Sequence, residues 1–141
     1  MKTKNIYRVV DYKHNKRGVK LKKELQSRIK IKTIVYDSNL DILELYTGAT
    51  TQHCININDL FIIHYNEKNK IVGIEILGIS KIYGINKKAL NSIKSAKIIM
   101  NTIPEENKVF IRAELVYPIK NEEIITNLIA SPPYEAPLVC N

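Results

Sequence analysis

The chain has 141 residues, a length that suits one compact domain. Hydrophobic residues make up 45% and charged residues 26%, a globular composition that excludes an intrinsically disordered chain. No run of about 18 apolar residues is present, so the sequence predicts no membrane span. The start, MKTKNIYRVVDYK, lacks the uninterrupted apolar core of a secretory signal, and we therefore expect a cytoplasmic protein.

The net charge of +8 comes from one segment. Residues 1–32 hold 12 basic and 2 acidic residues, whereas the remainder holds 10 basic and 12 acidic residues. A basic segment on a near-neutral body is typical of a nucleic-acid contact, because each neutralised phosphate releases counterions. The same pattern also fits a solvated face or a contact with an acidic protein.

Two features of this segment bear on the nucleic-acid hypothesis. Only Tyr7 and Tyr12 could stack on bases, and no helix-turn-helix, zinc-finger or ribonucleoprotein motif is present. If the segment does bind nucleic acid, the candidate contact residues are its basic side chains, Arg8, Lys13, Lys16, Arg17, Lys20, Lys22, Lys23 and Arg28.

In chain order, residues 1–30 form a basic N-terminal segment. Ile6–Tyr12 has strand character, and His14–Gly18 is a turn signal. Leu21, Leu25 and Ile29 recur at i, i+4 and i+8, which predicts an amphipathic helix.

Residues 31–82 are expected to form an antiparallel β-meander. Alternation over residues 31–36 predicts a first strand, and polar turn residues separate it from strands at 42–46, 54–57, 60–65 and 71–77. The last strands are apolar on both faces. Such a sheet needs cover on both sides, because a bare face would expose a large apolar patch.

The rest of the chain supplies candidate covers. Asn86 could cap a helix that runs to about Met100, since Leu90, Ile93 and Met100 lie at helical spacing. Residues 109–116 alternate as a long strand that ends at Pro118, and residues 119–129 add a strand or a helix. Residues 131–141 are a proline-rich, extended tail. The predicted class is α+β, with one domain at 31–130 whose meander sheet is covered by one or two helices.

One block in this region resembles a known family. The residues concerned run from YDSNLDILELYTG to FIIHYNEKNKIVGIEILGISK, and the matching positions are Tyr36, Asp37, Asp41, Leu43, Leu45, Tyr65, Val72, Gly73, Ile74, Glu75, Ile76, Leu77 and Ser80. They are similar to domain of unknown function 2283. The family has no established activity. Some members are encoded beside small toxin-like proteins, so the resemblance implies an antitoxin-type role.

No residue pattern predicts chemistry. Cys54 and Cys140 lack zinc-site spacing, and we expect both to be free thiols in a reducing compartment, with no metal and no cofactor. His64 is interpreted as a half-buried strand histidine with a hydrogen bond, in preference to a ligand or base. We expect Asp37, Asp41 and Asp59 to stabilise turns by hydrogen bonds to backbone amides, and we prefer this interpretation to a metal or acid/base role.

Two more residues of the block have structural interpretations. Glu75 is expected to form an ion pair with Lys81, Lys32 or Arg112, because a carboxylate on an apolar strand needs a partner. Gly73 is expected to allow a close approach of backbone or of an aromatic ring.

The sequence therefore predicts a non-enzymatic interaction protein that binds a protein partner, either a toxin or a second copy of itself, through its sheet. The alternative is a nucleic-acid or ribonucleoprotein binder that uses residues 1–32.

Overall fold

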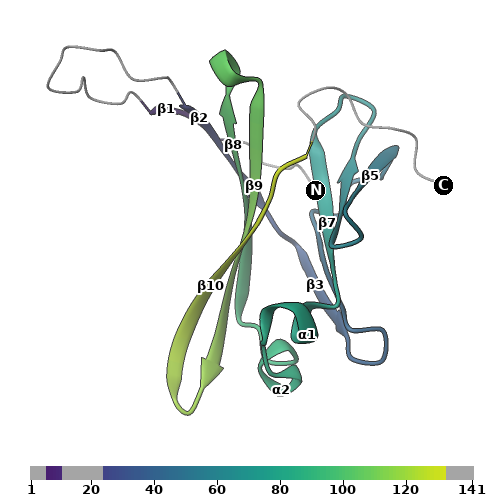
Figure 1. The fold of residues 1–141 in the computed structure, drawn as a ribbon, viewed down its shortest axis with the longest axis vertical. Helices are drawn as coiled ribbons and strands as arrows, with labels where there is room; N and C mark the ends of the chain where they lie inside the picture. The colour runs from purple at the N-terminus through teal and green to yellow at the C-terminus, as the bar shows by residue number, and fades with distance from the viewer. Residues whose placement is uncertain (1–5, 11–23, 133–141) are drawn as a thin grey trace, which may run out of the picture.

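The structure is a computed structural model that describes residues 6–10 and 24–132, which form two five-stranded antiparallel sheets (Figure 1). Sheet A has the order β1-β2-β8-β9-β10, with strands Ile6–Val10, Glu24–Lys30, Ser95–Ile103, Lys108–Ile119 and Glu122–Ala130. Sheet B has the order β3-β4-β7-β6-β5, with strands Thr33–Asp37, Ile42–Tyr46, Ile71–Leu77, Phe61–Tyr65 and His53–Ile57.

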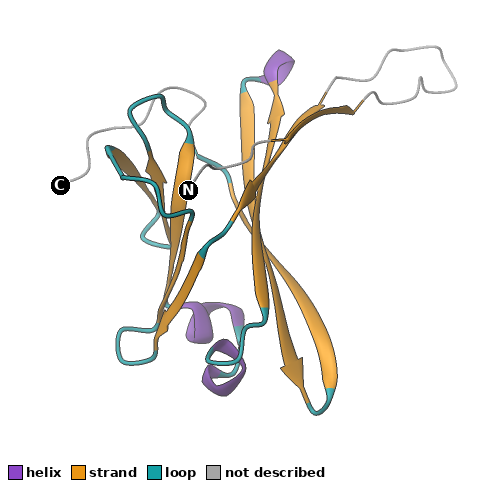
Figure 2. Cartoon of the chain, turned by 180° about the vertical axis from the view of Figure 1, so that it is seen from behind, coloured by secondary structure: helices purple, strands orange, loops and turns teal. Residues whose placement is uncertain are grey.

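Three short helical segments complete the described residues. Helices α1 (Ile79–Tyr83) and α2 (Lys87–Leu90) join the last strand of sheet B to β8 of sheet A and lie together at one end of the molecule (Figure 2). The 3-10 turn η1 (Pro104–Glu106) joins β8 to β9. No helix of the described ranges is long and apolar enough to cross a membrane.

The strands predicted at 31–82 are present, but their order is not that of a meander. β4 pairs with β7, and β5 lies at the far edge beyond β6, so the sheet has a Greek-key-like order. Within sheet B, strands that are adjacent in the sequence pair only as β3-β4 and as β5-β6-β7. The segment 47–50 therefore leads away from β4 and does not form a hairpin with β5.

The two predicted long helices are largely wrong. β2 occupies the region predicted as an amphipathic helix around Leu25 and Ile29, because Ser27 and Ile29 alternate with exposed Arg28 on a strand that pairs with β8. Asn86 does cap a helix, since its side chain accepts a hydrogen bond from the Lys88 amide, but α2 ends at Leu90. The described residues are thus mostly antiparallel strand, richer in β structure than an α+β class suggests.

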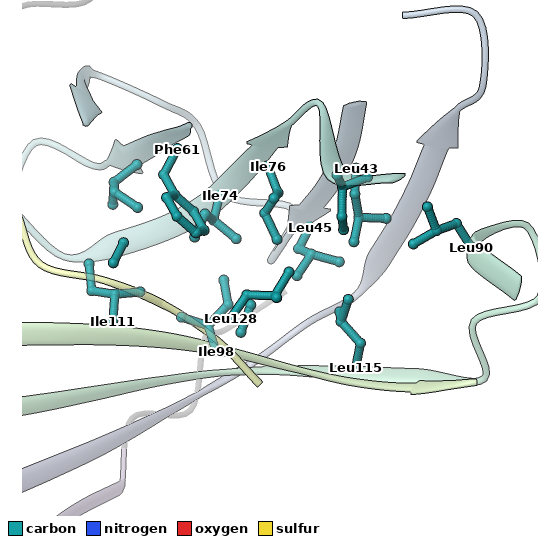
Figure 3. Packing of buried hydrophobic residues seen from close by; sticks show 14 of the residues in the cluster. Leu43, Leu45, Phe61, Ile74, Ile76, Leu90, Ile98, Ile111, Leu115 and Leu128 are labelled. Carbon is teal, nitrogen blue, oxygen red and sulfur yellow. The ribbon is translucent and has the colours of Figure 1, made fainter. Parts of the chain in front are cut away.

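The main cover of sheet B is sheet A. The aliphatic side chains of both sheets meet between them and are almost fully buried: Leu43, Leu45, Ile74 and Ile76 from sheet B, and Ile98, Ile111, Leu115 and Leu128 from sheet A (Figure 3). Each such side chain stabilises the fold by about 1.5–3 kcal/mol. Ile79 of α1 and Leu90 of α2 join this cluster.

Pro118 does not end its strand, contrary to expectation. β9 continues to Ile119, and a two-residue turn at Lys120 and Asn121 leads into β10, both residues having positive φ. In such a hairpin the pair that closes the turn is hydrogen-bonded and the next pair is not. Pro118 occupies that second pair, opposite Glu123, where no amide hydrogen is required.

Two predicted elements lie wholly or mostly outside the described ranges. These are the turn at His14–Gly18 and most of the proline-rich tail, of which only residues 131 and 132 are described.

Candidate functional site

The predicted basic contact residues are only partly described. Arg28 is exposed on β2, on the face of sheet A that points away from sheet B. The backbone of Arg8 lies in β1 in register with Gln26. The other six candidates, Lys13, Lys16, Arg17, Lys20, Lys22 and Lys23, lie outside the described residues.

A second arginine joins Arg28 on this outer face. Ile99 of β8 is in register with Arg28 of β2 on one side and with Arg112 of β9 on the other. Ile99 is only 2% exposed although it lies on the outer face of the sheet. Its burial is consistent with cover by the aliphatic stems of the flanking arginines. Sequence reasoning did not place Arg112 here, because the pairing of β8 with β2 joins segments about 70 residues apart.

The outer face of sheet B carries a polar group that we call the outer cluster: Glu44, Tyr46, His64 and Glu75. Nε2 of His64 lies 2.7 Å from Oε2 of Glu75 and 3.4 Å from the Tyr46 hydroxyl. A hydrogen bond to a carboxylate requires the proton on Nε2. Adjacent strands β4, β7 and β6 place these side chains on one face by register alone.

Glu75 therefore has a partner, but not one of the predicted lysines or arginine. Its partner is His64, bonded through Nε2; the Glu75 side chain is 18% exposed and the His64 side chain is 12% exposed. The interpretation of His64 as a half-buried, hydrogen-bonded strand residue is confirmed.

Two carboxylates face each other within the outer cluster, because Glu44 is in direct register with Glu75. Burial and the nearby charge of Glu75 raise the pKa of Glu44 above its ordinary value. Burial, together with the charges of Glu75 and Glu44, raises the pKa of Tyr46 to about 12. Glu44 and Tyr46 therefore each keep their proton to a higher pH than the same side chain does when fully exposed to water.

Gly73, which has no side chain, leaves room for the Tyr46 ring. A Cβ atom at residue 73 would lie 2.3 Å from Cδ1 of Tyr46, far inside van der Waals contact. The same ring meets the His64 ring edge-on, with centroids 5.3 Å apart. The predicted close approach at Gly73 is confirmed, and the group that approaches is Tyr46.

A second polar group, the Asp41 clasp, ties the β3–β4 turn to α1. Asp41 is 7% exposed and accepts hydrogen bonds from the Tyr36 hydroxyl at 2.6 Å, the Ser80 hydroxyl at 2.8 Å and the Ser80 amide at 3.1 Å. Burial alone would raise the pKa of Asp41, but the hydrogen bonds outweigh it and lower that pKa. Burial and the bond to Asp41 raise the pKa of Tyr36 to about 12.

The three turn aspartates do not converge. Asp37 accepts from the amides of Asn39 and Leu40 within its own turn, and Asp59 bonds Asn56. Across residues 6–10 and 24–132, no group of three His, Cys, Asp or Glu side chains could hold a metal ion. The arrangement of these carboxylates stabilises turns and strand pairs.

The free edge of β10 is a further candidate site. Ile125 and Ile129 are 62% and 61% exposed on the outer face of sheet A. β10 is the last strand of its sheet, and no strand of the described chain pairs with its other side. The Val116 carbonyl, opposite Ile125, accepts from the Lys94 amide beside β8 and so points away from β10. The backbone groups of residues 123, 125, 127 and 129 therefore point to the free edge.

Cys54 is disulfide-bonded, so the prediction of a free thiol there is wrong. The other cysteine of the chain, Cys140, lies outside the described residues. The wide sequence separation on which the free-thiol prediction relied gives no measure of distance in space. Because disulfides are typical of oxidising environments, the cysteines no longer support a reducing compartment.

Both polar groups lie within one family match. Residues 33–80 match the family described as protein of unknown function (DUF2283). The predicted resemblance is confirmed, and it covers about a third of the chain. Within this DUF2283 segment, the quoted residues Tyr36, Asp41 and Ser80 form the Asp41 clasp, whereas Gly73 and Glu75 belong to the outer cluster or support it.

No curated protein and no solved structure matches the chain. All five strands of sheet A lie outside the family match. The DUF2283 segment thus contains all of sheet B and both polar groups. The free edge at β10 belongs to the remainder of the chain.

Proposed function

We propose that this protein is a non-enzymatic interaction protein that self-associates through the free edge of β10. The observation that carries the proposal is that two features occur together on one edge strand: Ile125 and Ile129 have exposed side chains, and their backbone groups point to the free edge. Unpaired edge groups are a template for another strand. β10 contains no lysine or proline, residues that commonly protect an exposed edge.

The sequence of β10 suits a two-fold antiparallel pair. When two copies pair about Asn127, Ile125 of each copy lies opposite Ile129 of the other and Asn127 lies opposite its equivalent. A shift of the centre by one residue, to Thr126, would instead place Ile129 opposite Glu123. Apolar cross-strand pairs stabilise a sheet by about 0.2–1 kcal/mol each, so the register centred on Asn127 is favoured.

The first test removes the edge donor without disturbing the β9–β10 ladder. Asn127→Pro deletes an amide that points away from β9, a position where an edge strand tolerates proline. Sedimentation equilibrium over a concentration series should show a monomer–dimer equilibrium for the wild-type chain and only monomer for Asn127→Pro. A wild-type chain that stays monomeric up to high concentration would contradict the proposal.

A matched pair of charge variants tests the apolar contact. Ile125→Lys should abolish dimerisation, because it places charges opposite Ile129 across the two-fold axis. Val35→Lys makes the same change in charge on edge strand β3, where Val35 is 44% exposed, and should leave the equilibrium unchanged. Equal loss of the dimer in both variants would point to a general charge effect.

Cysteine cross-linking tests the register. Residues directly opposite in a hydrogen-bonded antiparallel pair have Cα atoms about 5.5 Å apart, within disulfide range. Asn127→Cys should therefore give a covalent dimer on oxidation. Ile125→Cys alone should not, because its equivalent lies four residues away along the partner strand.

The nucleic-acid alternative remains a prediction, and Arg28 and Arg112 on the outer face of sheet A favour it. Deletion of residues 1–32 would be a poor test, since it removes β2 and the core residue Ile29. Arg28→Gln with Arg112→Gln is sharper, because it retains the strands and should weaken binding to an RNA or DNA oligonucleotide in a salt-dependent way. An antitoxin-type role, a toxin partner and a cytoplasmic location also stay predictions.

A further inference from the structure

A hollow of about 500 Å³ lies between α2 and the β9–β10 turn. Pro118 and Ile119 of β9 contribute apolar surface, whereas Asn86, Lys88, Lys120 and Asn121 contribute polar groups. Ile119 is 41% exposed, so its side chain is accessible from solvent. A hollow of this volume is within the range that small-molecule ligands occupy.

The polar groups of the hollow are mainly hydrogen-bond donors. The Asn86 carbonyl oxygen already accepts from the Lys88 amide, so its NH₂ group is the part left to bind a ligand. Among the described residues, neither Lys88 nor Lys120 has an ion-pair partner, and no carboxylate lines the hollow. Glu123, two residues after Asn121, forms an ion pair with Lys94, with 3.2 Å between Oε1 and Nζ.

The backbone holds Lys120 at this place at some cost. Lys120 and Asn121 have φ of 48° and 69°, the conformation of a turn that prefers Asn-Gly. A lysine with a left-handed backbone is uncommon, and such residues often occur at ligand sites. The turn contributes Lys120 to the lining of the hollow, and α2 contributes Lys88.

We propose that this hollow binds a small amphipathic organic anion, whose acidic group lies between Lys88 and Lys120 and whose apolar part lies against Pro118 and Ile119. Two unpaired cations select a negative charge, and the absence of lining carboxylates removes competition for them. The apolar surface favours an organic body over a bare inorganic ion. The proposal is independent of dimerisation through β10.

The test compares three probes on the full chain. 1-Anilinonaphthalene-8-sulfonate combines an apolar body with an anionic group, N-phenyl-1-naphthylamine has the same body without the charge, and inorganic phosphate has charge alone. Fluorescence titration should show binding of the first probe that is clearly tighter than that of the second. Backbone amide shifts in ¹H–¹⁵N spectra should place the first probe at Lys120 and Asn121, and phosphate should cause much smaller shifts there.

Variants then assign the charge. Lys88→Gln and Lys120→Asn should each weaken binding of the anilinonaphthalene sulfonate about threefold, and the double variant roughly tenfold, as expected for partly exposed charge pairs. Lys120→Asn also suits the turn, so the fold should survive it. Lys68→Gln, an exposed turn lysine elsewhere, is the matched control and should have no effect.

Three results would overturn the proposal. Equal binding of the neutral naphthylamine would show that charge plays no part. Equal binding of phosphate would show that the apolar surface plays no part. Unchanged affinity in the double variant, or shifts at amides remote from the turn, would place the probe elsewhere on the molecule.

Discussion

The ring of Tyr46 lies against the backbone of Gly73, so closely that a Cβ atom on residue 73 would fall 2.3 Å from the ring. The two residues are directly opposite on β4 and β7. This contact places the Tyr46 hydroxyl 3.4 Å from His64, whose Nε2 bonds Glu75. The glycine of the family block therefore has a steric role, in that it admits the ring that completes the outer cluster.

Gly73→Ala should destabilise the protein by about 1–3 kcal/mol, because the added methyl must displace the Tyr46 ring or the strand. Urea denaturation followed by circular dichroism measures the change. In a Tyr46→Ala background the same substitution should cost at most a few tenths of a kcal/mol, since the clashing ring is gone. An equal penalty in both backgrounds would assign the glycine a role unrelated to Tyr46.

Glu44→Gln should stabilise the protein at neutral pH by about 0.5 kcal/mol, because it removes one of two carboxylates that face each other across β4 and β7. Burial and the charge of Glu75 raise the pKa of Glu44 in the folded state, so its ionised form opposes folding. The penalty is absent below the ordinary glutamate pKa and appears as the pH rises through the higher folded-state pKa.

Free energies of unfolding measured from pH 3 to pH 8 check this prediction. The difference between Glu44→Gln and the wild type should be near zero at the acid end and should grow with pH. Glu67→Gln changes the same charge at an exposed turn position and should give a flat difference. A stabilisation by Glu44→Gln that did not vary with pH would rule out the carboxylate pair as its cause.

The strands of sheet B could be predicted because their signals are local. Residues 42–46 and 71–77 are short, largely apolar runs between turn residues, and both strands have the predicted bounds. Strand order is not local. Nothing in residues 42–57 indicates that β4 pairs with β7 and not with β5, the next strand in the sequence. The pairing partner of β4 depends on which face the later strands bury.

In β8 the sequence predicts a helix, whereas the structure has a strand of the sheet that covers sheet B. The apolar residues of β8 fit helical spacing with those of α2, but Ile98 and Ile99 are consecutive and buried on opposite faces, which only a strand permits. The partner of Glu75 depends on strand register, which no local signal indicates. His64 is eleven positions earlier in the sequence and becomes its neighbour only through the β6–β7 pairing.

Cys54→Ser should lower the free energy of unfolding by about 2–4 kcal/mol, the range typical of a lost disulfide. Alkylation followed by peptide mass spectrometry gives a second check, since Cys54 in the native, unreduced protein should resist iodoacetamide until a reductant is added. The matched control is reduction of Cys54→Ser, which should change its stability little. Free alkylation of native Cys54 would contradict the bonded state.

Asp41→Asn tests the clasp that joins the β3–β4 turn to α1. Asparagine tolerates the left-handed backbone of this position, where φ is 55°, so the substitution removes the charge and retains the turn. Loss of a buried carboxylate that accepts three hydrogen bonds should cost about 1–3 kcal/mol at neutral pH. Asp59→Asn is the matched control, because Asp59 has φ of 58° but is exposed, and it should cost less than about 0.5 kcal/mol.

The sign of the pH dependence separates charge from shape at Asp41. Burial raises the pKa of Asp41, but the hydrogen bonds from Tyr36 and Ser80 lower it by a larger amount. The folded-state pKa therefore lies below the unfolded-state pKa. The stabilisation is therefore fully present above the ordinary aspartate pKa and is lost as the pH falls through the folded-state pKa. Stability curves of the wild type and Asp41→Asn should accordingly converge as the solution is made acid. Curves that stayed parallel down to pH 2 would mean that Asp41 acts through its shape, with no contribution from its charge.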